Sequence, residues 1–333
     1  MCDDRENVSA LQTTHKTNRS FYTHTLHALI KPFKPKLVSS SEVYPAGSQR
    51  LTPHSRARKL CDIKERQSSG IYVYDMQAKS PNASHAAKIS RRVYYFAGGG
   101  WKAPPSPQHW KFCAEICQKL PDTAVTVVSC PLAPHCPAAT TIPVLERFCS
   151  KELMESHARG ERIVLGGDSS GGNLVLCLTL QSLEHAFQDI SSTDVPPITL
   201  LAISPAVDLQ QMRKEGVYAE TDRNDPVLTV GSHNEEVALW AGESDAAQSW
   251  ISPINGDLAP LVKGNVRLIA VTGGYDVLTP DALRFKAKCE AAGVTGDWLH
   301  WEKQMHCFPL AFIYGLPESV QSKDWIVDRL REV

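Results

Sequence analysis

The sequence predicts an α/β protein with a mostly parallel central sheet flanked by helices. From residue 71 onward, short apolar runs alternate with helical patterns, which is typical of βαβ units. The runs at 198–203 and 266–271 are mostly aliphatic, as expected of central strands that are buried on both faces. With 333 residues, of which 42% are hydrophobic and 21% charged, the chain has an ordinary globular composition and is long enough for one large domain.

The first half of the chain supplies the predicted elements in order. Residues 1–60 are irregular, apart from a helix expected at 21–30 that ends at Lys31-Pro32. A serine at a helix start can accept a backbone N–H, and proline is tolerated at the first position. The elements expected next are a strand at 71–74, a strand at 93–96, a helix that begins with Ser106 as N-cap and Pro107 and runs to 120, a strand at 125–128, a helix at 143–157, a strand at 163–165 and a helix at 174–183.

The second half continues the alternation after one interruption. A buried strand is expected at 198–203, and the segment from 208 to 249 is then polar, with a short helical stretch at 235–240. A long excursion of this kind in a compact domain is usually a lid or a binding loop. The elements expected after it are a strand at 266–271, a helix with Thr279 as N-cap and Gly293 as its stop, a strand at 298–301 and a terminal helix at 318–330.

The charge of the chain is balanced, with 35 basic and 36 acidic residues and a net charge of −1. This balance gives no electrostatic reason to expect nucleic acid or an anionic membrane as a partner. Residues 1–60 carry ten of the basic and four of the acidic residues, which predicts a solvated N-terminal region rather than a binding arm. No apolar run approaches the roughly 18 residues of a membrane span, so no span is expected.

Ten cysteines raise the question of disulfides or a metal site. The chain opens on MCDDRE without the apolar segment of a secretory signal, so reduced thiols and a cytoplasmic location are expected. The cysteines between 113 and 149 are spaced irregularly and lack a paired C-x-x-C pattern, so no metal site is predicted. The glycines at 166–172 lack the lysine of a phosphate-binding loop and the spacing of a dinucleotide site. No cofactor is therefore expected.

A serine in the middle of a glycine-rich turn is the leading candidate for chemistry. The turn between the strand at 163–165 and the helix at 174–183 contains Gly167-Asp168-Ser169-Ser170-Gly171. This G-x-S-x-G pattern is typical of a nucleophile elbow, where a strained strand-to-helix turn exposes the serine hydroxyl. The same pattern also occurs in plain structural turns. Ser169 is therefore predicted as a nucleophile only together with a base, an orienting acid and an oxyanion hole.

Two backbone segments are candidates for the oxyanion hole. The N–H of Ser170 follows the candidate nucleophile directly, which is the usual position of one donor. The glycine triplet at 98–100 follows the strand at 93–96, and its missing side chains allow the backbone to approach a substrate closely. By itself the triplet would more often be a flexible turn. Upstream of an elbow it predicts an oxyanion loop, with Gly98 and Gly99 as donors.

His306 is the expected base among twelve histidines. It follows the last predicted strand, so that the serine, the acid and the histidine come in the chain order of α/β-hydrolases. His300 fits less well because it lies within that strand, and His135 and His157 precede the serine. Cys307, next to His306, is a candidate reactive thiol, although a small residue lining the pocket is the favoured interpretation.

Asp276 is the expected orienting acid, because it comes shortly after the strand at 266–271 and thus at the edge where open α/β sheets carry their sites. Asp208 is the main alternative, but it belongs to the strand before the polar excursion. Asp281 is interpreted as a first-turn helix charge that the helix dipole favours.

Taken together, the motifs resemble the hormone-sensitive-lipase-like family of α/β-hydrolases. The resemblance covers roughly residues 70–333, and a looser likeness exists to fungal secondary-metabolite enzymes. Two departures are Ala97, where the family usually has histidine before the glycines, and Cys307, where it usually has glycine. The residues that carry the resemblance are Gly98-Gly99-Gly100-Trp101, Pro131-Leu132-Ala133-Pro134 with Pro131 and His135 in place of the usual arginine and glutamate, the elbow through Asn173, the run from Ile203 to Leu209, Ser252-Pro253, Asp276, and His306 with Phe308.

The resemblance implies an α/β-hydrolase domain at 66–333 with a cap over the active site. The cap would be built from the N-terminal segment 1–65 and the insertion at about 209–249. The implied activity is hydrolysis of a carboxylic ester without a cofactor, and the replaced residues suggest a specialised small-molecule substrate. An altered geometry of the oxyanion loop is expected from Ala97.

The expected reaction uses Ser169 as nucleophile, forming an acyl-enzyme, with His306 as base, Asp276 as orienting acid and the amides of Gly98, Gly99 and Ser170 as oxyanion donors. Two alternatives stay open at this point. The same residues could serve acyl transfer, cyclisation or elimination in a biosynthetic pathway, or the fold could act as a ligand receptor without catalysis. A homodimer is one open arrangement of the chain.

Overall fold

The computed structural model describes residues 10–34, 42–79, 88–188 and 196–333. Within them, nine strands form one sheet in the order β1-β9-β8-β7-β6-β4-β5-β3-β2. Neighbouring strands from β1 to β5 in this order run parallel, and only the pairs β5–β3 and β3–β2 are antiparallel. The strands are β1 (Leu11–Lys16), β2 (Cys61–Ser68), β3 (Ile71–Ala78), β4 (Arg91–Phe96), β5 (Thr123–Val128), β6 (Arg162–Asp168), β7 (Ile198–Ile203), β8 (Arg267–Gly273) and β9 (Thr295–Trp301).

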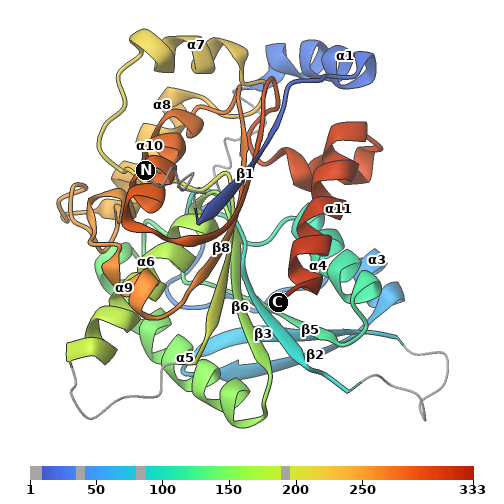
Figure 1. The fold of residues 1–333 in the computed structure, drawn as a ribbon, viewed down its shortest axis with the longest axis vertical. Coiled ribbons are helices and arrows are strands. Elements are labelled where there is room, and N and C mark those ends of the chain that lie inside the picture. The colour runs from blue at the N-terminus through green and yellow to red at the C-terminus, as the bar shows by residue number, and fades with distance from the viewer. Residues whose placement is uncertain (1–9, 35–41, 80–87, 189–195) are drawn as a thin grey trace, which may run out of the picture.

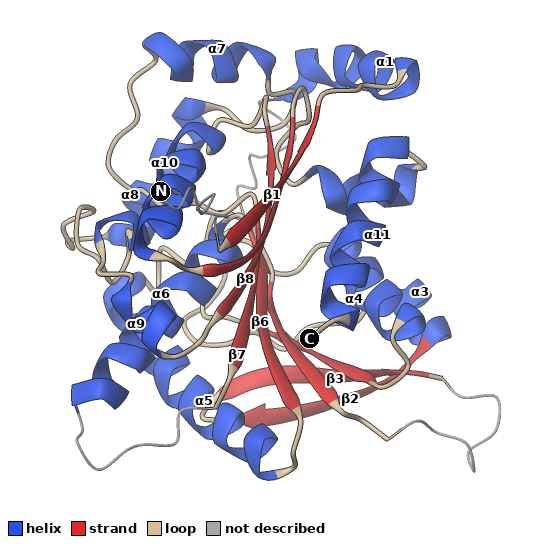
Figure 2. Cartoon of the chain, in the orientation of Figure 1, coloured by secondary structure: helices blue, strands red, loops and turns tan. Residues whose placement is uncertain are grey.

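Helices cover both faces of this twisted sheet, with α5, α6, α9 and α10 on one side and α3, α4 and α11 on the other (Figures 1 and 2). The mostly parallel sheet flanked by helices confirms the predicted fold class. The helices are α1 (Phe21–Ile30), η1 (Lys31–Phe33), α3 (Ser55–Leu60), α4 (Pro107–Lys119), α5 (Ala138–Ala158), α6 (Ser170–Gln188), α7 (Gly216–Asn224), α8 (Val230–Ala241), η3 (Pro253–Asn255), α9 (Ala259–Lys263), α10 (Thr279–Ala292), η4 (Phe308–Tyr314) and α11 (Pro317–Arg331).

The hydrophobic core lies in two layers, one on each face of the sheet. Strands β4, β5 and β7 are buried along their whole length, so their successive side chains point alternately into the two layers. On β4, for example, Tyr94 and Phe96 join the layer beneath α5 and α6, whereas Val93 and Tyr95 join the layer beneath α4 and α11. This two-sided burial explains why the central strands are apolar without alternation.

The N-terminal region contains a strand that the sequence did not reveal. Residues 1–60 were expected to be irregular apart from one helix, and the helix at 21–30 is confirmed as α1. However, β1 lies at the edge of the sheet, where it pairs in parallel with β9, from Leu11 opposite Gly296 to Lys16 opposite Trp301. Leu11 is the one residue of β1 that is fully buried. The strand therefore lacks the alternation of polar and apolar residues that a prediction needs.

Two helix starts also differ from expectation. Helix α5 begins at Ala138 rather than 143, so that Pro143 lies inside the helix. Both Pro143 and Ala139 are exposed, and water can therefore satisfy the carbonyl that the missing N–H leaves without a partner. Thr279 was expected to cap α10, but the N-cap is Leu278. The hydroxyl of Thr279 instead donates a hydrogen bond to the carbonyl of Gly273, at 2.6 Å.

The interruption between β7 and β8 contains more helix than expected. Helix α8 covers and extends the predicted stretch at 235–240, and α7 precedes it. The ammonium of Lys34, just after η1, donates to the carbonyls of Asp222 and Asp225. This contact ties α1 and η1 to the end of α7, and α1 and α7 lie at the same end of the molecule in Figure 1.

The described part of the chain contains no helix that is both long and apolar enough to cross a membrane. The cysteines in this part are all free thiols, and most of them are buried.

Candidate active site

Ser169 lies on a sharp turn between β6 and α6, as the sequence predicts. Its backbone has a φ of 54°, in the left-handed region, and its N–H donates to the carbonyl of Ile203 at 2.8 Å. A methyl group at Gly171 would overlap the carbonyl of Phe96, and one at Gly167 would overlap the backbone of Gly171. The turn can therefore close only with glycine at these two positions, which is the geometry of a nucleophile elbow.

The structure brings His306 and Asp276 to this serine. Asp276 lies in the loop between β8 and α10, and His306 lies in the loop between β9 and η4. The Nε2 atom of His306 is 2.9 Å from the Oγ atom of Ser169, and its Nδ1 atom is 2.9 Å from Oδ2 of Asp276. Because β6, β8 and β9 are parallel, their carboxyl ends meet at one edge of the sheet, and the three side chains form one hydrogen-bonded chain there.

Asp276 is held firmly as the inner member of this chain. Its side chain is fully buried, and its other oxygen, Oδ1, accepts the N–H of Leu278 at 2.9 Å. Burial opposes a charge on His306, but the carboxylate of Asp276 and the neighbouring Cys307 outweigh burial and raise the pKa of the imidazole above its ordinary value. With Nδ1–H donated to Asp276, Nε2 faces Ser169 as the acceptor of its proton.

The alternative residues have other places in the structure. His300 bonds to Thr272 through Nδ1 at 3.0 Å and stacks on His15, and His135 and His157 are exposed. The carboxylate of Asp208 binds Arg284, with an Oδ2 to Nη2 distance of 2.7 Å, and Asp281 accepts the hydroxyl of Tyr218. None of these five groups hydrogen-bonds to Ser169, His306 or Asp276 in the described residues.

The oxyanion loop requires one correction. The N–H of Gly98 was expected to be a free donor, but it donates to Oδ1 of Asp168 at 3.1 Å. The N–H groups of Gly99 and Gly100 have no hydrogen-bond partner among the described residues. The N–H of Ser170 belongs to the first turn of α6, where no helical carbonyl precedes it. Three backbone donors thus remain, and they belong to Gly99, Gly100 and Ser170.

Asp168 connects the elbow to this loop through a network that the sequence analysis missed. Besides the N–H of Gly98, it accepts the hydroxyl of Tyr95 at 2.7 Å and lies 3.1 Å from Nε2 of His109. Burial alone would raise the pKa of Asp168, but His109 and these hydrogen bonds hold it below its ordinary value. The Nδ1 atom of His109 accepts the N–H of Ser106 at 2.8 Å, which fixes the ring. A carboxylate at the end of an apolar strand is the signal that could have suggested a buried partner.

The two positions that depart from the family pattern adjoin this network. Cys307 has a φ of 50°, and its sulfur lies 3.4 Å from Nε2 of His306. Burial raises the pKa of the Cys307 thiol to about 12, so the thiol stays protonated and is a poor nucleophile. Ala97 borders a cavity of about 20 Å³ behind the oxyanion loop, together with Trp101, Ser170 and Trp240.

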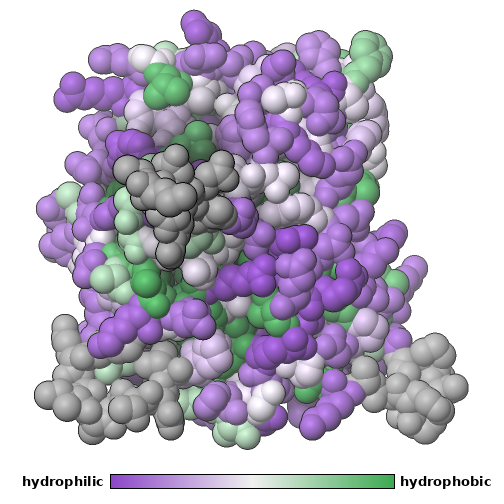
Figure 3. All heavy atoms as spheres, in the orientation of Figure 1, coloured by the Kyte–Doolittle hydropathy of each residue, from purple (hydrophilic) through white to green (hydrophobic). Residues whose placement is uncertain are grey.

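A larger cavity of about 730 Å³ lies over Ser169 and His306. Its walls come from α1, the oxyanion loop, residues 227–236 and residues 305–314, and most of the side chains are apolar. Helix α1 contributes Leu26 and Ile30. Figure 3 shows a mostly hydrophilic face with scattered hydrophobic side chains. On α1, Phe21 and Leu29 are exposed. The described residues contain no group of three or more His, Cys, Asp or Glu that could hold a metal ion.

Comparison with known proteins gives one consistent result. A family model described as alpha/beta hydrolase fold matches residues 93–310. Esterase LipU of Mycobacterium tuberculosis is 29% identical over 246 residues, which cover 73% of this chain and 78% of that protein. A solved esterase from the bacterial hormone-sensitive lipase family aligns with a TM-score of 0.71 at 21% identity, covering 92% of this chain and 97% of the other. The structure of EstE5 soaked with p-nitrophenyl butyrate aligns with a TM-score of 0.71 at 19% identity, covering 93% and 97%.

Proposed function

The chain belongs to the alpha/beta hydrolase fold family and is a hydrolase of the esterase and lipase type, and from this premise we propose that it is a serine carboxylesterase that acts through Ser169, His306 and Asp276. The observation that carries the proposal is the hydrogen-bonded chain from Asp276 through His306 to Ser169, with both distances at 2.9 Å. A nucleophile, a base and an orienting acid in this arrangement can activate a hydroxyl at neutral pH.

The proposed reaction starts with attack of the Ser169 Oγ atom on an ester carbonyl. His306 takes the hydroxyl proton, and Asp276 stabilises the imidazolium that forms. The carbonyl oxygen becomes an oxyanion, which the N–H groups of Gly99, Gly100 and Ser170 bind, each contributing on the order of 3 kcal/mol to the transition state. His306 then protonates the leaving alcohol, an acyl group remains on Ser169, and water activated by His306 releases the acid.

The substrate proposed from the cavity is a small ester with a mainly apolar body. A volume of about 730 Å³ lies in the usual range of small-molecule sites. The walls of the cavity include side chains of Leu, Ile, Val, Met and Ala, which favour apolar groups on either side of the ester bond. The departures at Ala97 and Cys307 support a specialised metabolite as substrate.

We assign the cap to two segments of the chain. Helix α1, from the N-terminal segment 1–65, and residues 227–236, from the insertion at 209–249, both line the cavity above Ser169. The remaining parts of the N-terminal segment have other roles, since β1 belongs to the sheet and α3 packs near α4. The free thiols of the described residues support an intracellular location.

The test is hydrolysis of p-nitrophenyl butyrate and labelling by a fluorophosphonate probe. Ser169→Ala should abolish both, because no acyl-enzyme or phosphonylated serine can form. Ser150→Ala is the matched control, since Ser150 is exposed on α5, and it should behave as wild type. Full labelling of Ser169→Ala would exclude Ser169 as the nucleophile. Incorporation of oxygen from labelled water into the released acid distinguishes hydrolysis from acyl transfer.

A further inference from the structure

Two charged side chains line the cavity without a short hydrogen bond and form a long ion pair with each other. Most other polar groups of the lining are paired, since Ser106 bonds to His109 at 2.9 Å and Gln108 donates to the hydroxyl of Tyr314 at 3.0 Å. The exceptions are Lys102, just after the oxyanion loop, and Glu236 on α8. We call Lys102 and Glu236 the open pair.

The carboxylate of Glu236 lies directly against the oxyanion loop. Its side chain is only 6% exposed, and a methyl group at Gly100 would overlap its carboxyl group. Gly100 has a φ of +60°, so the loop passes beneath the acid with no side chain between them. Any group that binds this carboxylate therefore lies a short distance from the oxyanion donors.

The members of the open pair form a long ion pair with each other. The Nζ atom of Lys102 lies 3.6 Å from Oε1 of Glu236, which is beyond the length of a good hydrogen bond. In the part of the chain that the structure describes, neither charged group has another hydrogen-bond partner. Burial raises the pKa of Glu236, and the ammonium of Lys102 opposes this effect. Both charged groups face the cavity, so a polar group bound beside them can form the shorter hydrogen bonds that their own contact does not provide.

The charges of the open pair select the kind of group that fits. A carboxylate would be repelled by Glu236, and an ammonium would be repelled by Lys102. A hydroxyl can donate its proton to Glu236 and accept a hydrogen bond from Lys102 at the same time. An alkyl group would leave the two charges with only their long contact to each other.

We propose that Lys102 and Glu236 form a subsite for a hydroxyl group, and that the substrate is an ester carrying a hydroxyl a few bonds from its reacting carbonyl. This inference rests on the proposed esterase function and adds the chemical class of the substrate. The apolar walls bind the hydrocarbon part, and the open pair recognises the one polar group on it.

The experiment compares esters that differ by one hydroxyl. One pair places it on the acid side, as ethyl butyrate and both enantiomers of ethyl 3-hydroxybutyrate, and a second pair places it on the alcohol side, as propyl butyrate and 3-hydroxypropyl butyrate. Acid release in a pH-stat gives kcat/KM for each ester. Wild type should favour the hydroxylated member of one pair by roughly tenfold or more, since hydrogen bonds to charged groups are the strong ones.

Variants of the open pair test the residues. Glu236→Met and Lys102→Met should each reduce this preference by roughly fivefold or more, because each leaves the hydroxyl with one charged partner. Glu236→Gln should keep part of the preference, since its amide oxygen still accepts a hydrogen bond. Glu235→Met is the matched control, because Glu235 is exposed on the same helix, and it should keep the wild-type preference.

Two results would overturn the inference without affecting the proposed function. One is hydrolysis of the plain esters with no preference in either pair, and the other is a preference that survives both methionine variants. Calorimetric titration of Ser169→Ala with the same esters measures recognition without turnover. If wild type hydrolyses none of them, the esterase proposal fails, and equal binding of the plain and hydroxylated esters to Ser169→Ala then overturns the subsite as well.

Discussion

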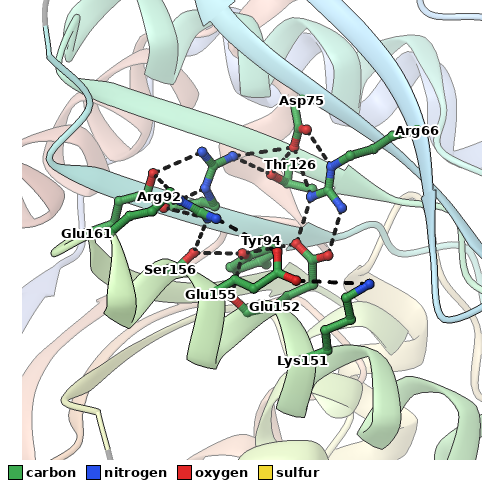
Figure 4. Close-up of polar contacts among 11 residues, drawn as sticks. Arg66, Asp75, Arg92, Tyr94, Thr126, Lys151, Glu152, Glu155, Ser156 and Glu161 are labelled. Carbon is green, nitrogen blue, oxygen red and sulfur yellow. Dashed lines mark hydrogen bonds and ion pairs between the residues drawn. The ribbon is translucent and has the colours of Figure 1, made fainter.

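Two groups of charged residues in the structure differ in how completely their charges are hydrogen-bonded within the protein. The open pair borders the catalytic cavity, and its two charges are held only by a long ion pair of 3.6 Å among the described residues. The arginine cluster lies near the amino ends of β4 and β6, where every charged group is paired (Figure 4). It consists of Arg66 on β2, Asp75 on β3, Arg92 on β4, Glu152 on α5 and Glu161 at the start of β6.

The geometry of the arginine cluster shows what a purely structural set of charges looks like. Both terminal nitrogens of Arg66 donate to Glu152, each at 2.7 Å, and its Nε donates to Asp75 at 2.7 Å. Arg92 donates in the same forked manner to Glu161, at 2.8 and 3.1 Å. Such paired contacts satisfy each guanidinium within the protein. The difference teaches that the arginine cluster is completed within the protein, whereas the open pair faces the cavity, where a ligand can bind to it.

The largest expected effect is a loss of stability when a carboxylate of the arginine cluster is removed. Glu152→Ala removes a carboxylate that is only 1% exposed and leaves the partly buried Arg66 with Asp75 as its remaining partner. The free energy of unfolding should fall by about 2–3 kcal/mol, the cost of lost hydrogen bonds to a charged group, measured by urea denaturation, while kcat/KM of the folded protein stays near wild type. Glu155→Ala is the control, since Glu155 is 47% exposed on the same helix. Equal stability of the two variants would contradict the structural role of the cluster.

The next effect concerns the hydrogen-bond network around Asp168, which connects the elbow to the oxyanion loop. His109→Leu removes the partner of Asp168 and should loosen the hold of Asp168 on Gly98. We expect kcat for p-nitrophenyl butyrate to fall by about tenfold to hundredfold, because the oxyanion donors are no longer aimed, with a smaller change in KM. His109→Gln, whose amide can still donate to Asp168, should recover much of the rate. If His109→Leu changed KM but left kcat unchanged, His109 would only shape the cavity.

Acidity should affect Asp225, which lies near Asp276, and Glu161 of the arginine cluster with opposite sign. Burial and the nearby Asp276 raise the pKa of Asp225 from 3.8 to about 7, so the folded state holds a proton that the unfolded chain releases, and stability falls as the pH rises between these values. The forked contact with Arg92 helps to lower the pKa of Glu161 from 4.5 to about 2. Its stabilising contribution is present above the unfolded value and is lost as the pH falls through the folded one.

The variant Asp225→Asn tests whether Asp225 makes the protein less stable as the pH rises. Asparagine cannot ionise, so the gain in melting temperature over wild type should be larger at about pH 8 than at about pH 4.5, by a few degrees. Its amide oxygen can still accept the N–H of Val227, as Oδ1 of Asp225 does at 2.9 Å. Glu161→Gln should show the reverse, because its melting temperature should fall further below that of wild type at the higher pH. A pH-independent difference for Asp225→Asn would refute the raised pKa.

The smallest effect is expected at Cys307. Glycine adopts a φ of 50° without strain, so Cys307→Gly should change the free energy of unfolding by about 1 kcal/mol or less and kcat/KM by no more than about threefold. The thiol is protonated, and although its sulfur lies 3.4 Å from Nε2 of His306, the Oγ atom of Ser169 lies closer to that nitrogen, at 2.9 Å. A loss of tenfold or more in kcat/KM would show that the sulfur takes part in catalysis.

The sequence predicted those parts of the site that depend on local order along the chain. Ser169, Asp276 and His306 each follow a recognisable strand, and parallel strands must bring such positions to one edge. Ser106 and Gly293 are likewise confirmed at the ends of their helices, because capping is decided within a few residues.

What the sequence did not reveal depends on contacts between distant segments. Nothing near Gly98 shows that its N–H is taken by Asp168, and nothing near His109 or Glu236 shows that a helix will bring it to the oxyanion loop. The edge strands β1 and β2 were missed for a related reason, since each has many exposed residues and is defined by its partner in the sheet. Assigning the oxyanion donors required the three-dimensional contacts.

The pairing of β1 with β9 has a consequence for the order in which the protein can form. β1 is synthesised well before β9, its partner, because the other strands of the sheet lie between them in the sequence. Helix α1 follows β1 by only a few residues, so this wall of the cavity cannot be fixed in place until β9 has emerged. The nascent chain must therefore keep β1 unpaired until β9 has been made, and such slow, distant pairing exposes a strand edge to other chains. An enzyme built in this way completes its cavity only after β9 has been made.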